Sequence, residues 1–129
     1  MNAQEIVAAN VAARGYRDGW TTEQFVARQL AKLTEELAEA TDQVMSRGDG
    51  DEEDDAPWLL GVWETGRAAG QAFDDKDAWS TAWINNQDAL RSELADMQVV
   101  LFAAAAALDF DVVQAAIDKS GADVARGVR

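Results

Sequence analysis

The chain has 129 residues, with 24 acidic against 11 basic side chains for a net charge of −13, and it contains neither cysteine nor histidine. This length fits one domain over residues 1–129. Without cysteine or histidine, disulfides, thiolate or imidazole metal ligands and histidine-based catalytic triads are excluded. Any chemistry must therefore use carboxylates, hydroxyls, amides, lysine, arginine or tyrosine. The negative charge disfavours a nucleic-acid partner, whose phosphates would be repelled.

Two further features bear on localisation. The longest apolar run, Val99–Leu108, is about half as long as a membrane span. The first residues, Met1–Glu5, lack the basic start and apolar run of a signal peptide. We therefore expect a cytoplasmic protein with no membrane partner.

The composition favours helices along the whole chain. Alanine, leucine, glutamate and glutamine are plentiful, and Pro57 is the only proline. The first helix is expected over about 3–14, and a glycine-containing turn then ends it. The second begins at a capping threonine, Thr21 or Thr22, and extends to about Ser46. The predicted fold class is all-α, a bundle of four or more helices.

Two more helices are expected in the second half of the chain. A long helix is predicted over about 86–108 and a shorter one over about 110–120. Asp109 is the expected N-cap of the last helix, and Gly121 is its expected stop. The residues between the two long helices, 48–85, are predicted to form an inserted segment.

The inserted segment has two unusual stretches. Residues 48–56 are almost entirely acidic or glycine, which predicts a solvated loop. An EF-hand is disfavoured there, because the midway glycine and the carboxylate spacing of that loop are missing. The remainder carries four of the five tryptophans, namely Trp58, Trp63, Trp79 and Trp83. We expect these aromatic side chains to pack the segment onto the body or onto another subunit, with stacking on a nucleobase as the alternative.

The second predicted helix carries a pair of glutamates beside its apolar side. Glu36 and Glu39 are three residues apart, so their carboxylates lie side by side at the edge of that face. Glu35 falls further round the helix. The apolar face itself consists of Val26, Leu30, Leu33, Leu37 and Val44.

The third predicted helix repeats this arrangement. Glu93 and Asp96 are again three residues apart at the edge of an apolar face. That face consists of Leu90, Leu94, Met97, Leu101 and Leu108. The strip that carries the two acids becomes apolar one turn later, at Val100, Ala103 and Ala107, and such a strip is expected to face the interior.

Packing of the two apolar faces would bring the two acidic pairs together. Several carboxylates in a small, partly dry space repel one another unless they are protonated or neutralised. A divalent cation is the natural remedy, and ligation by oxygen alone suits Mg²⁺, with Mn²⁺ as the alternative. One such glutamate run is more often a solvated helix face. Its repetition on a second helix favours the metal site.

The ordered pair of motifs resembles the signature of the MazG-like, all-α nucleoside triphosphate pyrophosphatases, the relatives of dimeric dUTPases and dCTP pyrophosphatases. The similarity covers about 22–46 and 86–120. It rests on Glu35-Glu36-x-x-Glu39 and on Glu93-x-x-Asp96. The segment 48–85 departs from the family, whose members usually have a short connection between the motifs.

The resemblance implies an oligomeric helical bundle, a homodimer or homotetramer, that cleaves a nucleoside triphosphate between its α- and β-phosphates. Mg²⁺ would be held by Glu36, Glu39, Glu93 and Asp96. Glu35 would orient or deprotonate the attacking water. Contacts with the substrate are expected from Lys32, Lys119, Arg126, Trp20 and Asn10, with Asn2 and Tyr16 as further candidates.

Two other classes of protein fit parts of the sequence. A non-catalytic acidic helical protein, which binds a partner or mimics nucleic acid, would use the charge of −13 and the tryptophan-bearing segment. Such a mimic needs acids spread over its outer surface, whereas an enzyme needs them gathered in one pocket. A di-iron carboxylate bundle is disfavoured, because that class adds histidine ligands.

Overall fold

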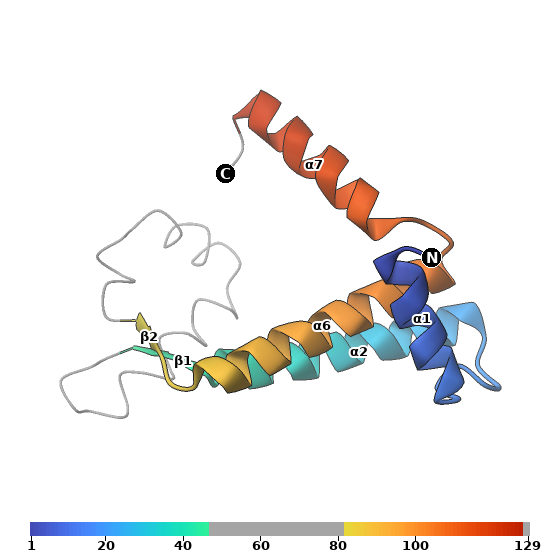
Figure 1. Cartoon of the computed structure of the whole chain (residues 1–129), viewed down its shortest axis with the longest axis horizontal. Coiled ribbons are helices and arrows are strands. Elements are labelled where there is room, and N and C mark those ends of the chain that lie inside the picture. Colours follow the sequence, from blue (N-terminus) through green and yellow to red (C-terminus); the bar gives the residue numbers. More distant parts are fainter. Residues whose placement is uncertain (47–81, 128–129) are drawn as a thin grey trace. The chain divides into compact units, whose positions relative to one another are not determined.

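The computed structural model describes residues 1–46 and 82–127 (Figure 1). The predicted acidic loop at 48–56 and three of the tryptophans, Trp58, Trp63 and Trp79, lie outside the described residues. The elements are α1 (Ala3–Ala13), α2 (Thr22–Thr41), β1 (Val44–Ser46), β2 (Ala82–Ile84), α6 (Gln87–Ala107) and α7 (Val112–Arg126). The all-α prediction is confirmed over these ranges, in which two three-residue strands are the only strands beside the four helices.

Contacts along the chain group the residues into two compact units. One contains Met1–Glu35 and Ala95–Arg129, and the other contains Glu36–Leu94. The boundaries fall within α2 and α6, so each of these helices belongs to both units. Whether residues 1–129 form a single domain stays a prediction.

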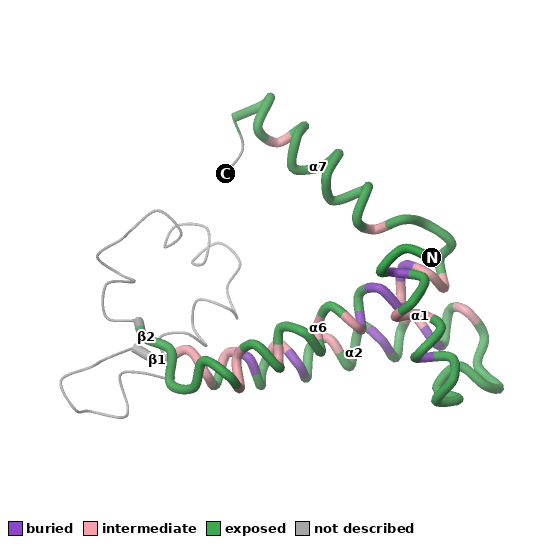
Figure 2. Tube along the Cα trace, viewed as in Figure 1, coloured by how far each residue is buried: buried purple, intermediate pink, exposed green. Residues whose placement is uncertain are grey.

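The first unit has its core where α1, α2 and α6 meet. Val11, Phe25 and Ala103 form the buried cluster, and the half-buried Val7, Val99 and Ala107 pack against it. Figure 2 shows buried positions in α1, α2 and α6, whereas none of the residues of α7 is buried. Gln4 joins α1 to the start of α7, because its amide donates to the Phe110 carbonyl at 2.7 Å and accepts from the Val112 amide at 3.0 Å.

The second unit contains the end of α2, the start of α6 and the strands between them. β1 and β2 pair antiparallel, with Met45 opposite Trp83. The Asn85 amide donates to the Gln43 carbonyl at 2.8 Å and so extends this pairing by one bond. The ladder therefore fixes the last turn of α2 beside the first turn of α6.

Helix starts follow capping chemistry that is visible in the sequence. Thr21 and Gln24 form a reciprocal capping box, in which each side chain accepts from the backbone amide of the other, at 3.1 and 3.0 Å. Asn2 caps α1, and Asn86 caps α6 by accepting from the Ala89 amide. The predicted cap in the Thr21–Thr22 pair is confirmed at Thr21.

The predicted ends of two helices are wrong. α2 ends at Thr41 instead of about Ser46, because the chain closes with a tighter bond from the Gln43 amide to the Ala40 carbonyl and then enters β1. α7 starts after Asp111, whose carboxylate accepts from the Gln114 amide at 3.0 Å.

The last helix also continues past its predicted stop. Asp109 has a left-handed backbone (φ 59°) and lies in the turn before the helix, so it is not the cap. Gly121 lies inside α7, which ends instead at Gly127, a residue with a φ of 73°.

The faces that α2 and α6 bury differ from the prediction by about one residue. Leu30 is 56% exposed, and Leu94, Leu101 and Leu108 are also exposed. On α2 the buried residues are instead Phe25, Gln29, Glu36 and Ala40. On α6 the predicted interior strip is confirmed at Val100 and Ala103, which are buried.

In the two described ranges, no individual helix combines the length and the apolarity that crossing a membrane requires. α6 and α7, which are bent by 102° at the break between them, meet the criterion only as a pair and only by length and composition.

Candidate metal centre

Three of the candidate acids, Glu36, Glu39 and Glu93, belong to the second unit, where the last turns of α2 face the first turns of α6. Glu36 and Glu39 lie one helical turn apart on α2, and the side chain of Glu93 on α6 reaches both of them. Glu36 is only 6% exposed and Glu93 is half-buried, whereas Glu39 is exposed. On α2 the site therefore extends from a buried carboxylate, Glu36, to an exposed one, Glu39, within one helical turn.

The electrostatics of this cluster appear most clearly at Glu93. A hydrogen bond between the Glu93 and Glu39 carboxyls contributes most to raising the pKa of Glu93, from 4.5 to about 7. Burial, a second hydrogen bond to Glu36 and the negative charges of both partners act in the same direction. A proton therefore stabilises this cluster when no cation is present.

Asp96 adds a fourth carboxylate one turn beyond Glu93 on the same helix. One carboxylate oxygen each from Glu36, Glu93 and Asp96 lie within 4.8 Å of one another. Three anionic oxygens at this separation can hold a metal ion. Asp96 itself is exposed, which leaves an open side for water or another ligand.

The residues fit a hard divalent cation. All the donors are carboxylate oxygens, the ligand type that Mg²⁺, Ca²⁺ and Mn²⁺ prefer. The Oε2 atom of Glu93 is buried and accepts no hydrogen bond from the described residues. A buried anionic oxygen without a donor is costly, and a cation or a proton removes that cost.

The structure places the other residues of the predicted motif outside the buried part of the site. Glu35 is exposed, on a different side of α2 from the buried Glu36. Lys32 is exposed one turn before Glu36 and takes part in an interaction of its own. The roles of Glu35 as a base and of Lys32 as a phosphate contact stay predictions.

The remaining predicted substrate contacts lie in the first unit. Lys119 and Arg126 both pair with Asp123 of α7, which lowers the pKa of that carboxyl. Trp20 is 43% exposed, and the guanidinium of Arg28 lies 4.8 Å from the centroid of its ring, within the range of a cation–π contact.

Three predicted contacts lie on or beside α1. Asn10 is exposed on this helix, and Tyr16 is exposed in the turn that follows it. Asn2 accepts from the Glu5 amide at 2.8 Å and serves as the helix cap. Capping therefore accounts for the position of Asn2 without a substrate. Contacts of Asn10 and Tyr16 with a nucleotide stay predictions.

Two glutamines, one within α2 and one in the turn just after it, were not singled out from the sequence. Gln29 is 6% exposed, seven residues before Glu36, and Gln43 follows Glu36 by the same interval. The Oε1 atom of Gln43 is buried without a donor among the described residues. The seven-residue spacing returns to the same helix face after two turns, so it could have identified Gln29, whereas Gln43 lies beyond the end of α2 and had no such signal.

A cavity of about 440 Å³ lies between the start of α1 and the turn from α6 to α7. Its lining includes Gln4, Glu5, Asp109 and Phe110. None of the four predicted metal ligands contributes to it, so the cavity does not locate the acidic site.

Comparisons with known proteins were made for the whole chain. No family model, curated protein or solved structure matches it.

Proposed function

We propose that this chain is a Mg²⁺-dependent nucleoside triphosphate pyrophosphohydrolase that removes unwanted nucleotides from the cellular pool. It would convert a ribo- or deoxyribonucleoside triphosphate and water to the monophosphate and pyrophosphate. The observation that carries the proposal is the convergence of Glu36, Glu93 and Asp96, whose carboxylate oxygens lie within 4.8 Å of one another. The order and spacing of the two motifs, which resemble the MazG-like pyrophosphatases, support the same activity.

The acids of the two helices have a common role in this proposal. Glu36, Glu39, Glu93 and Asp96 would hold the cation, with Mn²⁺ as a substitute for Mg²⁺. When bound, the cation supplies charge that offsets the triphosphate and stabilises the charge developing on the transferred phosphorus. The burial of Glu36 would hold one ligand in place, and the exposure of Asp96 would leave the cation accessible to the substrate.

Two exposed residues of α2 complete the proposed reaction. The Glu35 carboxylate takes a proton from water as the water oxygen bonds to the α-phosphorus. The bond from that phosphorus to the bridging oxygen breaks, and pyrophosphate leaves with the electron pair. Lys32, one turn before Glu36, contacts a phosphate oxygen and helps to orient the chain of phosphates for in-line attack.

The distribution of acids distinguishes this proposal from a non-catalytic acidic binding protein. A nucleic-acid mimic presents its carboxylates at the outer surface, where water solvates each of them. Here Glu36 is buried, and the pKa of Glu93 is raised to about 7 by two neighbouring carboxyls. Such crowding is costly to a protein that does not use it, which supports an enzyme.

The activity is tested by incubating the protein with a panel of canonical and modified nucleoside triphosphates and Mg²⁺, with pyrophosphate and monophosphate as the measured products. We expect equal amounts of the two products and complete loss of turnover in excess EDTA. Glu36→Gln and Asp96→Asn should each reduce kcat/KM by roughly 100-fold or more, because charge stabilisation at the reacting phosphorus is lost.

Glu23→Gln is the matched control, since it removes one exposed carboxylate from the first turn of the same helix. This variant should retain wild-type turnover. Full activity in EDTA, or unchanged kcat/KM in both Glu36→Gln and Asp96→Asn, would contradict the proposal. Far-UV circular dichroism on each variant separates loss of catalysis from loss of fold.

A further inference from the structure

A cavity separate from the candidate metal centre lies in the first unit. It is bounded by the start of α1 and by the turn that joins α6 to α7, two segments that Figure 1 shows beside each other. Its volume is about 440 Å³, which is within the range of sites that bind small molecules. We call it the α1–α7 cavity.

One part of the lining is apolar. The apolar lining residues are Met1, Ala8, Ala106 and Phe110. The backbone beside Phe110 is held in place, because the buried Gln4 amide donates to the Phe110 carbonyl at 2.7 Å and accepts from the Val112 amide at 3.0 Å. Phe110 itself is 44% exposed. It therefore offers a fixed apolar surface to a ligand in the cavity.

The charged part of the lining is acidic. Glu5 of α1 and Asp109 and Asp111 of the turn contribute three carboxylates, whereas the amino group of Met1 is the one positive group among the lining residues. The carboxylates of Glu5 and Asp109 have neither an ion pair nor a hydrogen bond within residues 1–46 and 82–127. A positively charged ligand would find acceptors here that the described part of the chain does not use.

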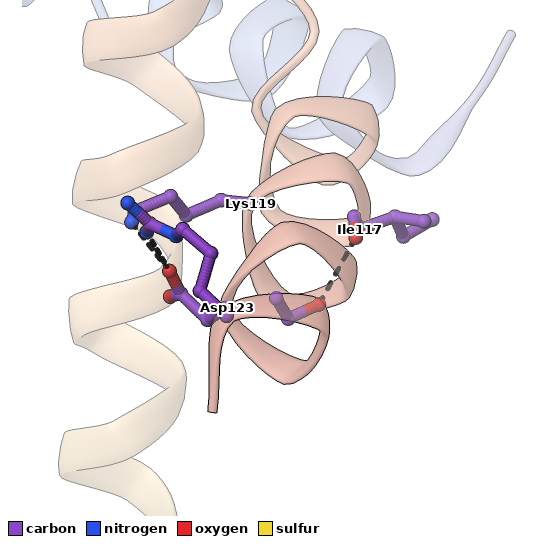
Figure 3. Close-up of polar contacts among 5 residues, drawn as sticks. Ile117, Lys119 and Asp123 are labelled. Carbon is purple, nitrogen blue, oxygen red and sulfur yellow. Dashed lines mark hydrogen bonds and ion pairs between the residues drawn. The ribbon is translucent and has the colours of Figure 1, made fainter. Parts of the chain in front are cut away.

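The basic residues of α7 do not neutralise these acids. Lys119 and Arg126 both pair with Asp123, which lies further along the helix. Figure 3 shows the Lys119 and Asp123 side chains directed toward each other. Neither of the two cations lines the cavity. The charge of the lining therefore stays negative.

An anion is a poor match for this cavity. The N-termini of two helices, α1 and α7, adjoin it, and helix N-termini often bind anions. Here both ends are capped from within the chain, because Asn2 accepts from the Glu5 amide at 2.8 Å and Asp111 accepts from the Gln114 amide at 3.0 Å. An anion would therefore meet carboxylates in place of these amide donors.

A single metal ion is also a poor match. Within the two described ranges, the acids whose ligand atoms converge to within 4.8 Å are Glu36, Glu93 and Asp96. The acids of the α1–α7 cavity form no such group. Their charges are separate, so an extended ligand with more than one positive group fits them better than a compact ion does.

We propose that the α1–α7 cavity binds a linear aliphatic polyamine. Its ammonium groups would donate charge-assisted hydrogen bonds to Glu5, Asp109 and Asp111. The methylene groups between them would lie against Phe110 and the other apolar lining residues, which removes their surface from water. This site depends neither on the proposed hydrolase activity nor on the candidate metal centre.

Isothermal titration of the full chain in EDTA tests the binding, with spermidine, putrescine and butylamine as probes. Spermidine should bind at one saturable site with a Kd below about 1 mM. Putrescine should bind more weakly, and butylamine, which has one ammonium group, more weakly still. An absence of saturable binding, or equal affinity for the three amines, would overturn the proposal.

A chain of net charge −13 attracts any polycation, so the variants must separate the cavity from this general attraction. Glu5→Gln combined with Asp109→Asn removes two charges from the lining. Asparagine tolerates the left-handed backbone of residue 109, whose φ is 59°. Spermidine should bind this double variant at least roughly fivefold more weakly, because two charge contacts are lost.

Asp18→Asn combined with Glu23→Gln is the matched control. It gives the same net charge by removing two exposed carboxylates that do not line the cavity. Its affinity for spermidine should change by less than about twofold, since salt screens charges at a distance. Equal weakening in the two double variants would show that only the overall charge attracts the amine.

Filling the cavity tests its shape without a change of charge. Ala8 is half-buried in the lining, so Ala8→Leu reduces the space and should weaken spermidine binding at least roughly fivefold. Ala12→Leu, at an exposed position of the same helix outside the lining, should bind as the wild type does. Unchanged affinity in a folded Ala8→Leu would overturn the proposal. Ala106→Leu replaces it if circular dichroism shows a loss of helix.

The position of the bound amine is checked by amide chemical shifts in NMR spectra. Spermidine should shift the signals of Glu5, Asp109 and Phe110, and Glu36→Gln should bind it with unchanged affinity. Shifts confined to the neighbourhood of Glu36 and Glu93 would place the amine at the candidate metal centre and overturn the proposal. Because no nucleotide is turned over in these experiments, their outcome is separate from that of the hydrolase assays.

Discussion

The Glu93 carboxyl of α6 shares a hydrogen bond with Glu39 of α2, and this contact contributes most to the rise of the Glu93 pKa to about 7. Burial and the neighbouring Glu36 act in the same direction. Near neutral pH the Glu93 carboxyl therefore loses its proton, and the cluster gains one negative charge. A cation that binds there must displace this proton, so metal binding and protonation are linked.

Metal affinity should rise with pH. Below the Glu93 pKa of about 7, binding of a divalent cation releases one proton, and its affinity should increase by up to about tenfold per pH unit. Above that pKa the affinity should become level. Isothermal titration with Mn²⁺ from about pH 5.5 to about pH 8, in buffers of different ionisation enthalpy, measures both the affinity and the proton release.

Glu93→Gln serves as the control for this linkage, because it removes the titrating carboxyl and keeps the size of the side chain. It should bind the cation more weakly and with little dependence on pH in the same range. An affinity of the wild type that stays constant from pH 5.5 to pH 8 would mean that Glu93 is not a ligand.

The stability of the metal-free protein should fall as pH rises from about 4.5 to about 7. In this interval the folded state keeps a proton on Glu93 that the unfolded state has lost, since the pKa is about 7 in the fold and 4.5 in its absence. The free energy of unfolding therefore decreases with pH and becomes level above about 7. Urea unfolding in EDTA at a series of pH values measures this slope.

Asp123 does not obscure that measurement. Its pKa is lowered from 3.8 by Lys119 and Arg126, so the stability it contributes is lost only as pH falls below that value. Glu93→Gln should flatten the slope between pH 4.5 and 7, and saturating Mg²⁺ should also abolish the fall in the wild type, because the bound cation displaces the proton from the folded state. A wild-type stability that rises through this interval without metal would contradict the assignment of the raised pKa to Glu93.

Sequence alone was sufficient where the signal is local. The Thr21–Gln24 capping box and the spacing of apolar residues place the starts of α2 and α6 within a residue of their observed positions. The ends of α2 and α7 depend on other interactions. β2, far along the chain, pairs with residues predicted to be helical, and α7 continues through Gly121 although glycine disfavours a helix interior.

The proximity of Glu36, Glu93 and Asp96 was predictable from the sequence, whereas the buried face of α2 was not, and the role of these acids as metal ligands stays a prediction. Each helix has two acids three residues apart, and on α6 the strip that carries them continues with Val100 and Ala103. This pattern was enough to predict that Glu36 and Glu93 lie close together. The wheel could not decide which of two neighbouring faces of α2 is buried, because a rotation of about one residue exchanges Leu30 for Gln29. The raised pKa of Glu93 depends on its contact across helices with Glu39, which no local pattern contains.

The face that α2 buries can be tested by a matched pair of truncations. Phe25 is 2% exposed in the core, so Phe25→Ala should lower the free energy of unfolding by about 3–5 kcal/mol. Leu30→Ala removes an apolar side chain that is 56% exposed on the same helix and should cost less than about 1 kcal/mol. Urea unfolding at one protein concentration compares them, and a larger loss for Leu30→Ala would place the buried face of α2 where the sequence pattern first suggested.

The bonds of Gln4 should hold the start of α7 against α1. This side chain is 8% exposed, and its amide satisfies both the Phe110 carbonyl and the Val112 amide. Gln4→Ala leaves both backbone groups without a partner and should lower the free energy of unfolding by about 2–4 kcal/mol. Amide hydrogen exchange should accelerate first at Val112.

Gln114→Ala, which removes an exposed bond to Asp118 within α7, is the control and should change stability by less than about 0.5 kcal/mol. Equal losses in the two variants would show that the amide of Gln4 does not join the helices.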